Sequence, residues 1–493
     1  MPKDLFIDIF DHRNPPIYKY YDGENWSTSL SGKLTEIISP VDGQIVGKIQ
    51  QVAFAEVDRC LDRVKIAQKE WAKVPITKRT QILHLAADWM REHEHFLSTL
   101  LMAEIGKSYV ESRDEIVRSA DMIEYFSHEG LNMRGEQLSG DAFPGYDQTK
   151  IAMISRVPLG VVAAISPCNY PINLSVSKIA PALITGNGVI FKPPTNGSII
   201  SLYLTKIFLT AGLPKGLLAT VTGSGSILGD YLVTQHDVNM VAFTGSSEVG
   251  EIIAKKTGMI PLLLECGGNN PALVLPDADL EVTAEEIVKG AFSYSGQRCT
   301  AIKYVICLSG TDEKLLPLVL KKTKALFKMG DIRIETNNFG PVITDEAAHK
   351  IEKALLIARA EGAKVVLGGK REGRYIEPTV IIDAKPHMEI VHSEIFGPIL
   401  SFITVKSTEE AVNIINSSKY GLQVSIFTSD EGTGIKLAAK LETGSVLINS
   451  KPQRGPDHFP FIGIKSSGIG VQGIKYTLEA MTRFKPVILN KPH

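Results

Sequence analysis

Between residues 55 and 106 apolar side chains recur every three to four positions. In the clearest part of this stretch the apolar positions are Ile82, Leu83, Leu85, Ala86, Trp89 and Met90. A spacing near 3.6 residues predicts amphipathic helices, and the stretch is long enough for two of them. We therefore expect two helices here, with Lys78 and Arg79 facing water.

From about residue 160 the pattern changes to short β-rich runs that alternate with helical stretches. The predicted strands are 161–165, 189–192, 218–221 and 240–243, and the predicted helices are 174–183, 199–211, 227–234 and 248–256. Alternation of this kind is typical of βαβ units and predicts a parallel sheet.

The second half of the chain repeats this alternation and is long enough for an α/β domain of its own. Strands are expected at 272–275, 302–306, 400–404, 424–428 and 445–449, and a helix at 347–360. A chain of 493 residues is too long for one hydrophobic core, so two or three domains are expected. The polar stretch 129–149 and the C-terminus are either arms that pack on a partner chain or surface loops.

Composition excludes several classes of protein. Hydrophobic residues make up 44% and charged residues 22%, as in ordinary globular proteins, and the net charge of −1 gives no electrostatic reason to bind nucleic acid or an anionic membrane. The N-terminal apolar stretch contains acids, unlike a secretory signal. Five cysteines without CxxC spacing argue against a disulfide framework and a cysteine metal site, so we expect no metal and a cytoplasmic location.

Cys299 is the thiol best suited to act as a nucleophile. Glycine, glutamine and Arg298 precede it; the glycine permits close backbone approach and the guanidinium favours thiolate over thiol. Cys60 and Cys307 fall in helix-like and strand-like apolar patterns and are expected to be buried and structural. Cys266 could compete for the role, but the adjacent carboxylate should raise its pKa.

That carboxylate, Glu265, is the candidate general base. It ends the apolar run 260–264 and precedes Cys266 and two glycines. A carboxylate that leaves an apolar strand should be desolvated, which raises its pKa toward the range of a general base. The alternative is an exposed glutamate at a strand end.

Two strand-to-helix turns could hold a dinucleotide. The first is Gly245 followed by a helix that begins at Ser246 or Ser247, where backbone N–H groups can receive a pyrophosphate, although ordinary helix capping would place the same residues there. The second contains Lys192 and Thr195 where an acid would bind an unphosphorylated ribose, which favours NADP over NAD. The alternative for Lys192 is a solvated side chain before a proline turn.

In this order the segments resemble the aldehyde dehydrogenase superfamily over essentially the whole chain. The matching pieces are 166–171, 191–193, 243–246 with Gly250, 264–268, 296–299, 394–398, and 459–461 with 465–468. The resemblance implies an α/β fold with a Rossmann-type cofactor domain, an α/β catalytic domain and a small β oligomerisation arm. We accordingly assign 1–128 and 150–260 to dinucleotide binding, 261–445 to the catalytic domain, and 129–149 and 470–493 to arms that form a homodimer or homotetramer.

The resemblance also implies a role for each matching residue. Cys299 would attack an aldehyde, Asn169 and the backbone N–H of Cys299 would hold the oxyanion, and Glu265 would activate the water that hydrolyses the thioester. The implied contacts to NADP, with NAD possible, are Ser166, Lys192, Thr195, Asp230, Gly245, Ser246, Gly250, Glu394 and Phe396. The chain departs from the family pattern at Cys168 and Cys266, where an aromatic residue and a leucine are usual.

Substrate identity is predicted from a set of polar residues expected near the thiol: Arg118, Tyr170, Arg298, Thr300 and Arg454. Guanidinium groups gathered beside a thiol favour a phosphorylated aldehyde. The set is similar to the phosphate-binding residues of the family's NADP-dependent, non-phosphorylating branch, which oxidises glyceraldehyde 3-phosphate to 3-phosphoglycerate. Alternatives are an unphosphorylated hydroxyaldehyde such as glyceraldehyde or lactaldehyde, transfer of the acyl group to coenzyme A, and a catalytically silent binding protein.

Overall fold

Five parallel strands form the centre of an eight-stranded sheet in the computed structural model, which describes residues 6–491. In spatial order they are β13 (Leu262–Glu265), β12 (Met240–Thr244), β9 (Val161–Ile165), β10 (Gly188–Lys192) and β11 (Leu218–Thr220). The antiparallel strands β26 (Gly468–Ile469) and β3 (Tyr20–Tyr21) flank this core, and β4 (Trp26–Ser27) lies beyond β3. The carboxyl ends of the parallel strands meet at one edge, where Lys192, Thr244 and Glu265 lie.

Helices cover both faces of this sheet because its strands are apolar on both sides. On one face Val162 and Ala164 pack with α2 (Ile76–Glu92), α3 (Glu94–Ile105), α4 (Tyr109–Leu131), α5 (Asn173–Ile184) and α6 (Ser198–Thr210). On the other face Val161 and Ala163 pack with α1 (Phe54–Trp71), α7 (Asp230–Val233) and α8 (Ser247–Lys256). The predicted strands and helices of this half are therefore confirmed to within about two residues at most ends, apart from a π-helical turn, Gly225–Gly229, before α7.

The prediction of two helices over residues 55–106 was wrong, because the structure has three. The second ends at His93, whose backbone (φ −103°, ψ 14°) leaves the helical region before α3 begins at Glu94. Arg79 does not face water as expected: its guanidinium donates to the carbonyls of Val74 (3.0 Å) and Ile184 (2.7 Å). Near the N-terminus a short 3-10 turn, Ile7–Ile9, leads into a small sheet of β1 (Phe10–Asp11), β2 (Ile17–Tyr18), β6 (Ile45–Gln50) and β5 (Leu34–Ile38).

The second half folds around a seven-stranded sheet. Its order is β16 (Lys364–Leu367), β19 (Thr379–Ile382), β20 (Ile399–Val405), β15 (Ile302–Leu308), β14 (Asn270–Val274), β22 (Gln423–Phe427) and β23 (Ser445–Ile448). All neighbours are parallel except β16 and β19. One face packs against α9 (Leu280–Phe292) and α10 (Thr311–Leu326), and the other against α11 (Asp345–Ala360), α12 (Glu389–His392), α13 (Thr408–Ser417) and α14 (Glu431–Ala438).

Three two-stranded ribbons complete the connections. They pair β17 (Arg371–Glu372) with β18 (Tyr375–Ile376), β21 (Tyr420–Gly421) with β25 (Ile464–Lys465), and β24 (Phe461–Ile462) with β27 (Val471–Gln472). The ribbon of β21 and β25 ties the segment after β23 to the residues just before β22, the ribbon of β24 and β27 lies within that segment, and β26 pairs with β13 of the eight-stranded sheet. This late segment therefore joins the two halves of the molecule at the carboxyl end of β13.

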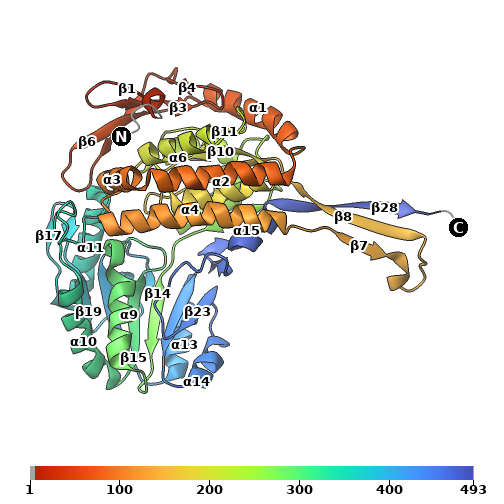
Figure 1. Ribbon diagram of the computed structural model, residues 1–493. Coiled ribbons are helices and arrows are strands. Elements are labelled where there is room, and N and C mark those ends of the chain that lie inside the picture. Colours follow the sequence, from red (N-terminus) through yellow and green to blue (C-terminus); the bar gives the residue numbers. More distant parts are fainter. Residues whose placement is uncertain (1–5, 492–493) are drawn as a thin grey trace.

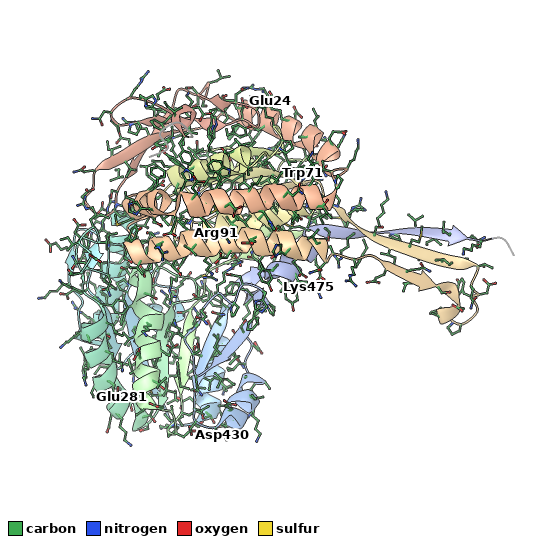
Figure 2. All side chains as sticks on the ribbon, in the orientation of Figure 1. Glu24, Trp71, Arg91, Glu281, Asp430 and Lys475 are labelled. Atoms are coloured by element: carbon green, nitrogen blue, oxygen red, sulfur yellow. The ribbon has the colours of Figure 1, made fainter. Side chains whose placement is uncertain are left out.

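A three-stranded antiparallel arm extends away from the body (Figure 1). It consists of β7 (Glu136–Ser139), β8 (Lys150–Pro158) and β28 (Thr482–Asn490), with β8 in the middle. Near the predicted arms 129–149 and 470–493, α4 continues to Leu131 and the short helix α15 (Ile474–Ala480) packs against α4, while β8 pairs with β28 over nine residues. Figure 2 shows the arm's side chains pointing into open space. Over residues 6–491 no helix combines the length and hydrophobicity needed to span a membrane.

Candidate active site

Cys299 lies in a tightly held loop between α9 and β15. The loop begins with a turn in which Tyr294, Ser295 and Gly296 all have positive φ (49°, 51° and 69°), a backbone conformation that side chains rarely adopt. Lys303 Nζ donates to the Gly296 carbonyl (2.8 Å) and Ser295 Oγ donates to the Gly340 carbonyl (2.7 Å). The carbonyl of Cys299 itself accepts from Asn270 Nδ2 at 2.7 Å. The surroundings therefore fix the backbone of the thiol.

The thiol is not ionised by its neighbours in this state. Burial, followed by the charges of Glu265 and Glu394, raises the pKa of Cys299 to about 12. Arg454 and Arg298 act in the opposite direction but do not prevail. The guanidinium of Arg298 thus favours the thiolate, as expected, but burial and two carboxylates outweigh its effect on the pKa.

Glu265 ends β13 and is buried, as predicted, but its surroundings are polar rather than apolar. Its Oε2 accepts from Thr244 Oγ1 at 2.7 Å, and Lys178 Nζ lies 3.9 Å from the same oxygen. Its Oε1 forms an ion pair with Arg454 Nη1. Strand pairing places Thr244 and Glu265 opposite each other in β12 and β13, so the sheet register brings the hydroxyl to the carboxylate. Cys266 is buried beside it, and burial and then Glu265 raise the pKa of Cys266 to about 12.

Asn169 is buried against the loop that carries Cys299. Its Nδ2 donates to the Gln297 carbonyl at 3.0 Å, and the side chain of Gln297 accepts the backbone N–H of Ile343 at 2.9 Å. An amide with N–H groups next to the thiol can stabilise negative charge on a substrate oxygen. The structure thus brings the predicted nucleophile, oxyanion donor and base into one buried cluster.

The two glycines after Cys266 are needed because other groups approach them closely. A Cβ on Gly267 would lie 2.1 Å from Glu394 Oε2 and 3.2 Å from Ser247 Oγ, and a Cβ on Gly268 would lie 2.3 Å from the Cys299 carbonyl oxygen. Gly268 N–H donates to Glu394 Oε1 at 3.1 Å. Burial raises the pKa of Glu394 and lowers that of its neighbour Lys303, whose Nζ lies 5.7 Å from the centre of the Phe396 ring.

The turn between β12 and α8 has the form expected for an anion site. Ser246 caps the helix by accepting the Val249 N–H at 3.3 Å, and Gly245 packs against the Phe243 ring, which a Cβ would contact at 2.3 Å. The Oγ of Ser247 is buried and has no hydrogen-bond partner within residues 6–491. Gly250 allows α8 to lie against the sheet, because a Cβ there would meet Cys266 Sγ at 2.3 Å.

At the end of β10, Lys192 is buried rather than solvated. Its Nζ donates to the Pro193 carbonyl at 2.9 Å, and burial lowers its pKa to about 8. Ser166 lies at the adjacent strand end, where its N–H donates to the Lys192 carbonyl (3.4 Å), and Thr195 is half-buried in the turn that follows. Asp230 lies apart from this group in a partly exposed ion pair with Lys256.

Two of the three predicted substrate arginines already have carboxylate partners. Arg118 makes a two-pronged ion pair with Asp457, both N–O distances being 2.7 Å, and Arg454 bonds Glu265 and Gln472. Arg298 differs, since its Nη2 donates to the Gly290 carbonyl (2.8 Å) while its Nε is buried without a hydrogen-bond partner in the described part of the chain.

Tyr170 and Thr300 are the remaining predicted substrate residues. Burial raises the pKa of Tyr170, so the phenol stays neutral, and Arg298 and then Arg118 are the cations that counter this. Thr300 is buried next to Cys299. Their neighbourhood thus contains two guanidinium groups and a neutral hydroxyl.

Two buried lysines next to the site were missed by the sequence analysis. Lys178 of α5 donates to Thr244 Oγ1 at 2.7 Å and Leu174 O at 3.0 Å, and burial lowers its pKa to about 8. Lys303 lies within β15, whose other side chains are apolar apart from Tyr304. The available signal was a single charged residue inside a helix or strand without other charges. Burying such a charge is costly unless it has a specific partner.

The sequence profile of the aldehyde dehydrogenase family matches residues 26–487. The chain belongs to the aldehyde dehydrogenase family. The predicted resemblance and the predicted α/β class are thereby confirmed, and the enzyme is an aldehyde dehydrogenase of the NAD(P)-dependent type.

Several similar members of the aldehyde dehydrogenase family are named NADP-dependent glyceraldehyde-3-phosphate dehydrogenase, while a relative from Methanococcus maripaludis, 35% identical over 471 residues and covering 94% of this chain and 99% of the relative, is named lactaldehyde dehydrogenase. The chain is 44% identical over 478 residues to NADP-dependent glyceraldehyde-3-phosphate dehydrogenase of Pisum sativum, covering 97% of this chain and 96% of the relative. A protein of the same description from Streptococcus equinus is 44% identical over 475 residues, covering 96% and 98%. The solved structure of NADP-dependent glyceraldehyde-3-phosphate dehydrogenase from Bacillus halodurans, complexed with NADP, superposes with a TM-score of 0.93 at 43% identity, covering 96% and 99%.

Proposed function

We propose that this aldehyde dehydrogenase oxidises glyceraldehyde 3-phosphate to 3-phosphoglycerate with NADP, without forming an acyl phosphate. The observation that carries the proposal is the guanidinium of Arg298, which adjoins the reactive thiol and has a buried Nε without a partner among the described residues. A buried, unmet N–H on a cation is the group that a phosphate oxygen satisfies. The names of the relatives support the same substrate.

The residues at the strand ends fit a phosphorylated dinucleotide. The start of α8 offers backbone N–H groups, the capping Ser246 and the unpartnered hydroxyl of Ser247 to a pyrophosphate. Lys192, Thr195 and Ser166 lie at the neighbouring strand ends, where a buried cation suits a ribose phosphate, while the charge of Glu394 acts on the thiol and the Phe396 ring faces Lys303. When bound there, NADP supplies the hydride acceptor. Asp230 pairs with Lys256, so we assign it to positioning α8 rather than to contact with the cofactor.

The chemistry on the protein side follows from the cluster around Cys299. Glu265, the carboxylate whose charge acts most on Cys299, accepts the thiol proton and passes it to solvent; the sulfur forms a bond to the aldehyde carbon, and the carbonyl oxygen becomes an oxyanion held by Asn169 and the backbone N–H of Cys299. After oxidation the acyl group remains on sulfur as a thioester. Glu265 then accepts a proton from a water, whose oxygen attacks the acyl carbon and releases the acid and the thiol. Lys178 and Thr244 hold the carboxylate of Glu265 for this step.

Two of the three arginines proposed to act on the substrate phosphate already bind carboxylates of the protein. Arg454 is bonded to Glu265, so a phosphate that engages Arg454 competes with the general base for the same guanidinium. Arg118 keeps its two-pronged pair with Asp457 and donates to the Arg454 carbonyl, so we expect it to position Arg454 rather than to bind the phosphate itself. Among the three, we therefore expect Arg298 to contribute most to phosphate affinity.

The test compares kcat/KM for glyceraldehyde 3-phosphate and glyceraldehyde, with NADP and NAD, in wild type and Arg298→Met. We expect a strong preference for the phosphate ester in wild type. The variant should lose roughly 10- to 100-fold in kcat/KM for the ester, the value of a charge-assisted hydrogen bond, and little for glyceraldehyde. Equal efficiency for both aldehydes in wild type would contradict the substrate and favour an unphosphorylated hydroxyaldehyde.

Two further assays exclude the other classes. Product analysis with and without coenzyme A distinguishes hydrolysis from acyl transfer, and the presence of Glu265 predicts free acid in both cases. Alkylation of Cys299 that is blocked by aldehyde distinguishes an enzyme from a silent binding protein, in which the thiol would not be protected.

We also propose that the arm of β7, β8 and β28 joins copies of the chain into a homodimer or homotetramer. Its exposed side chains include Leu138, Met153, Phe484, Val487 and Ile488, an apolar set that water does not favour. The free thiols of all five cysteines fit a reducing compartment such as the cytoplasm.

A further inference from the structure

Lys107 is a buried charge that the proposed chemistry does not use. Its side chain is 1% exposed and lies immediately before Ser108, the residue that caps α4. The ammonium forms an ion pair with Glu115 and lies over two aromatic rings, 3.4 Å from the centre of Tyr170 and 4.7 Å from that of Tyr294. An ammonium is costly to bury unless its partners compensate, so these three contacts account for its presence.

On one side, this arrangement contacts the segment that follows Asn169, the proposed oxyanion donor. Tyr170 follows Asn169 directly, and its ring lies against the ammonium. The other oxygen of Glu115, Oε1, accepts the backbone N–H groups of Ile172 at 2.9 Å and Asn173 at 3.1 Å. The ion pair thus contacts this segment at a ring and at two consecutive backbone positions.

The other side reaches the turn that leads to Cys299. Tyr294, at positive φ, donates its backbone N–H to Glu111 Oε1 at 2.8 Å and its hydroxyl to the Ile105 carbonyl at 3.2 Å. The rings of Tyr170 and Tyr294 meet edge to face, 6.2 Å apart. The start of α4 lies where the two halves of the molecule meet in Figure 1. It therefore contacts both the segment that contains Tyr170 and the turn that contains Tyr294.

We propose that Lys107 is a positioning residue that acts through Tyr170. Its ammonium, held by Glu115, fixes the Tyr170 ring against Tyr294 and so places the phenol hydroxyl where it meets the substrate phosphate. This inference rests on the proposed function, because the phosphate is the ligand that the hydroxyl would bind. A compact ammonium suits the task, since it can face two rings and one carboxylate at once.

A purely structural role would leave a different signature. If Lys107 only neutralised Glu115, its loss would lower stability and reduce kcat/KM alike for every aldehyde. A role through Tyr170 instead weakens binding of the phosphorylated aldehyde and leaves the chemical step almost intact. The two roles therefore separate in KM, in kcat and in the dependence on the Tyr170 hydroxyl.

The experiment is a double-mutant cycle on Lys107→Met and Tyr170→Phe, assayed with NADP and either glyceraldehyde 3-phosphate or glyceraldehyde. We expect Lys107→Met to raise KM for the phosphate ester roughly tenfold, a value between those of exposed and desolvated cation–π contacts, with kcat within about twofold. In the Tyr170→Phe background the same change should add less than about twofold, because the hydroxyl it positions is gone. Glyceraldehyde should show no comparable rise in KM.

A second variant guards against a folding failure. Lys107→Met leaves Glu115 as an unpaired buried carboxylate, whereas Lys107→Met with Glu115→Gln removes both charges and keeps an oxygen that accepts the N–H groups of Ile172 and Asn173. The paired variant should recover thermal stability but not the KM for the phosphate ester. Recovery of KM together with stability, or additive effects of Lys107→Met and Tyr170→Phe, would overturn the proposal. A wild type without preference for the phosphate ester would instead contradict the substrate assignment on which the proposal rests.

Discussion

At the scale of single residues, the protonation of Cys299 can be tested directly. Because burial and two carboxylates raise its pKa to about 12, the ligand-free protein should react slowly with iodoacetamide, and the rate should rise about tenfold per pH unit from pH 7 to 10 without a plateau. Glu265→Gln removes the larger of the two charge contributions and should lower this pKa, so alkylation at pH 8 should be faster. Arg298→Met should slow it.

Cys299→Ser identifies the alkylated thiol: Cys60, Cys266 and Cys307 are buried and burial raises the pKa of each, so labelling that survives this substitution would fall on the partly exposed Cys168. A plateau near pH 8 in the ligand-free enzyme would show that the positive charges outweigh burial. The same Glu265→Gln variant should accumulate the acylated enzyme after one turnover, with kcat reduced by about 10²–10⁴ if it is the base for hydrolysis.

Gly268 offers a second test at this scale. Its Cβ would lie 2.3 Å from the Cys299 carbonyl oxygen, so Gly268→Ala must displace the loop that carries the thiol. We expect a folded protein whose kcat falls at least tenfold, since a shift of about 1 Å in a reacting group can cost 10²-fold. Gly258→Ala is the matched control, because nothing lies within 4 Å of a Cβ there. Equal activity of both variants would show that the loop yields without cost.

Residue types and spacing predicted the reacting groups but not their partners. Cys299, Glu265 and Asn169 stand in recognisable local contexts, and the structure brings them together as expected. The ion pair between Glu265 and Arg454 joins residues far apart in sequence, so no local pattern could reveal that the base has a cationic partner. For the same reason the sequence indicated the charge next to Cys299 but not the burial that outweighs it.

At the scale of elements, the start of α6 depends on a carboxylate from another helix. Glu104 of α3 is fully buried and accepts the backbone N–H groups of Gly197, Ile199 and Ile200 at 2.8–2.9 Å. Burial nevertheless raises its pKa from 4.5 to about 7. An acid with a raised pKa in the folded state is less favourably ionised there than in the unfolded chain, so its contribution to stability should fall as pH rises from about 4.5 to about 7.

Glu104→Gln removes this titration and keeps an accepting oxygen. The melting temperature of the variant relative to wild type should therefore increase steadily between pH 4.5 and pH 7 and be constant above about pH 8. Thermal unfolding of both proteins across this range measures the difference. A difference in melting temperature that decreases with pH would mean that the three N–H groups, rather than burial, determine the pKa of the Glu104 carboxylate.

Elements were predictable where the pattern was unambiguous. The parallel strands are apolar on both faces, and β9 and β23 begin at the expected residues. The break between α2 and α3 was missed because the sequence around His93 contains neither glycine nor proline, so nothing local marks the end of the helix. Strand β8 was not predicted from the sequence, because its partner, β28, lies more than three hundred residues away.

At the scale of the whole molecule, the arm and the seven-stranded sheet each present an edge strand. Strand β28 is at the edge of the arm, and β23 is at the edge of the sheet, with its four side chains only partly buried. Edge strands with exposed apolar side chains favour pairing with another chain. The late segment with Arg454 and Phe461 lines, together with β23, a cavity of about 370 Å³. A neighbouring copy at this edge would therefore lie close to Arg454.

We therefore expect Ile488→Lys to dissociate the assembly. Ile488 is 69% exposed in the single chain, and a lysine in a contact between copies would bury an unpaired charge. Size-exclusion chromatography with light scattering should show the variant as a monomer while wild type elutes as a dimer or tetramer. Lys485→Gln, on the same exposed strand, is the control and should keep the wild-type mass. If the contact also supports the cavity beside β23, the monomeric variant should show a higher KM for the phosphate ester with little change in kcat. A wild type that is already monomeric at assay concentration would contradict the role of the arm.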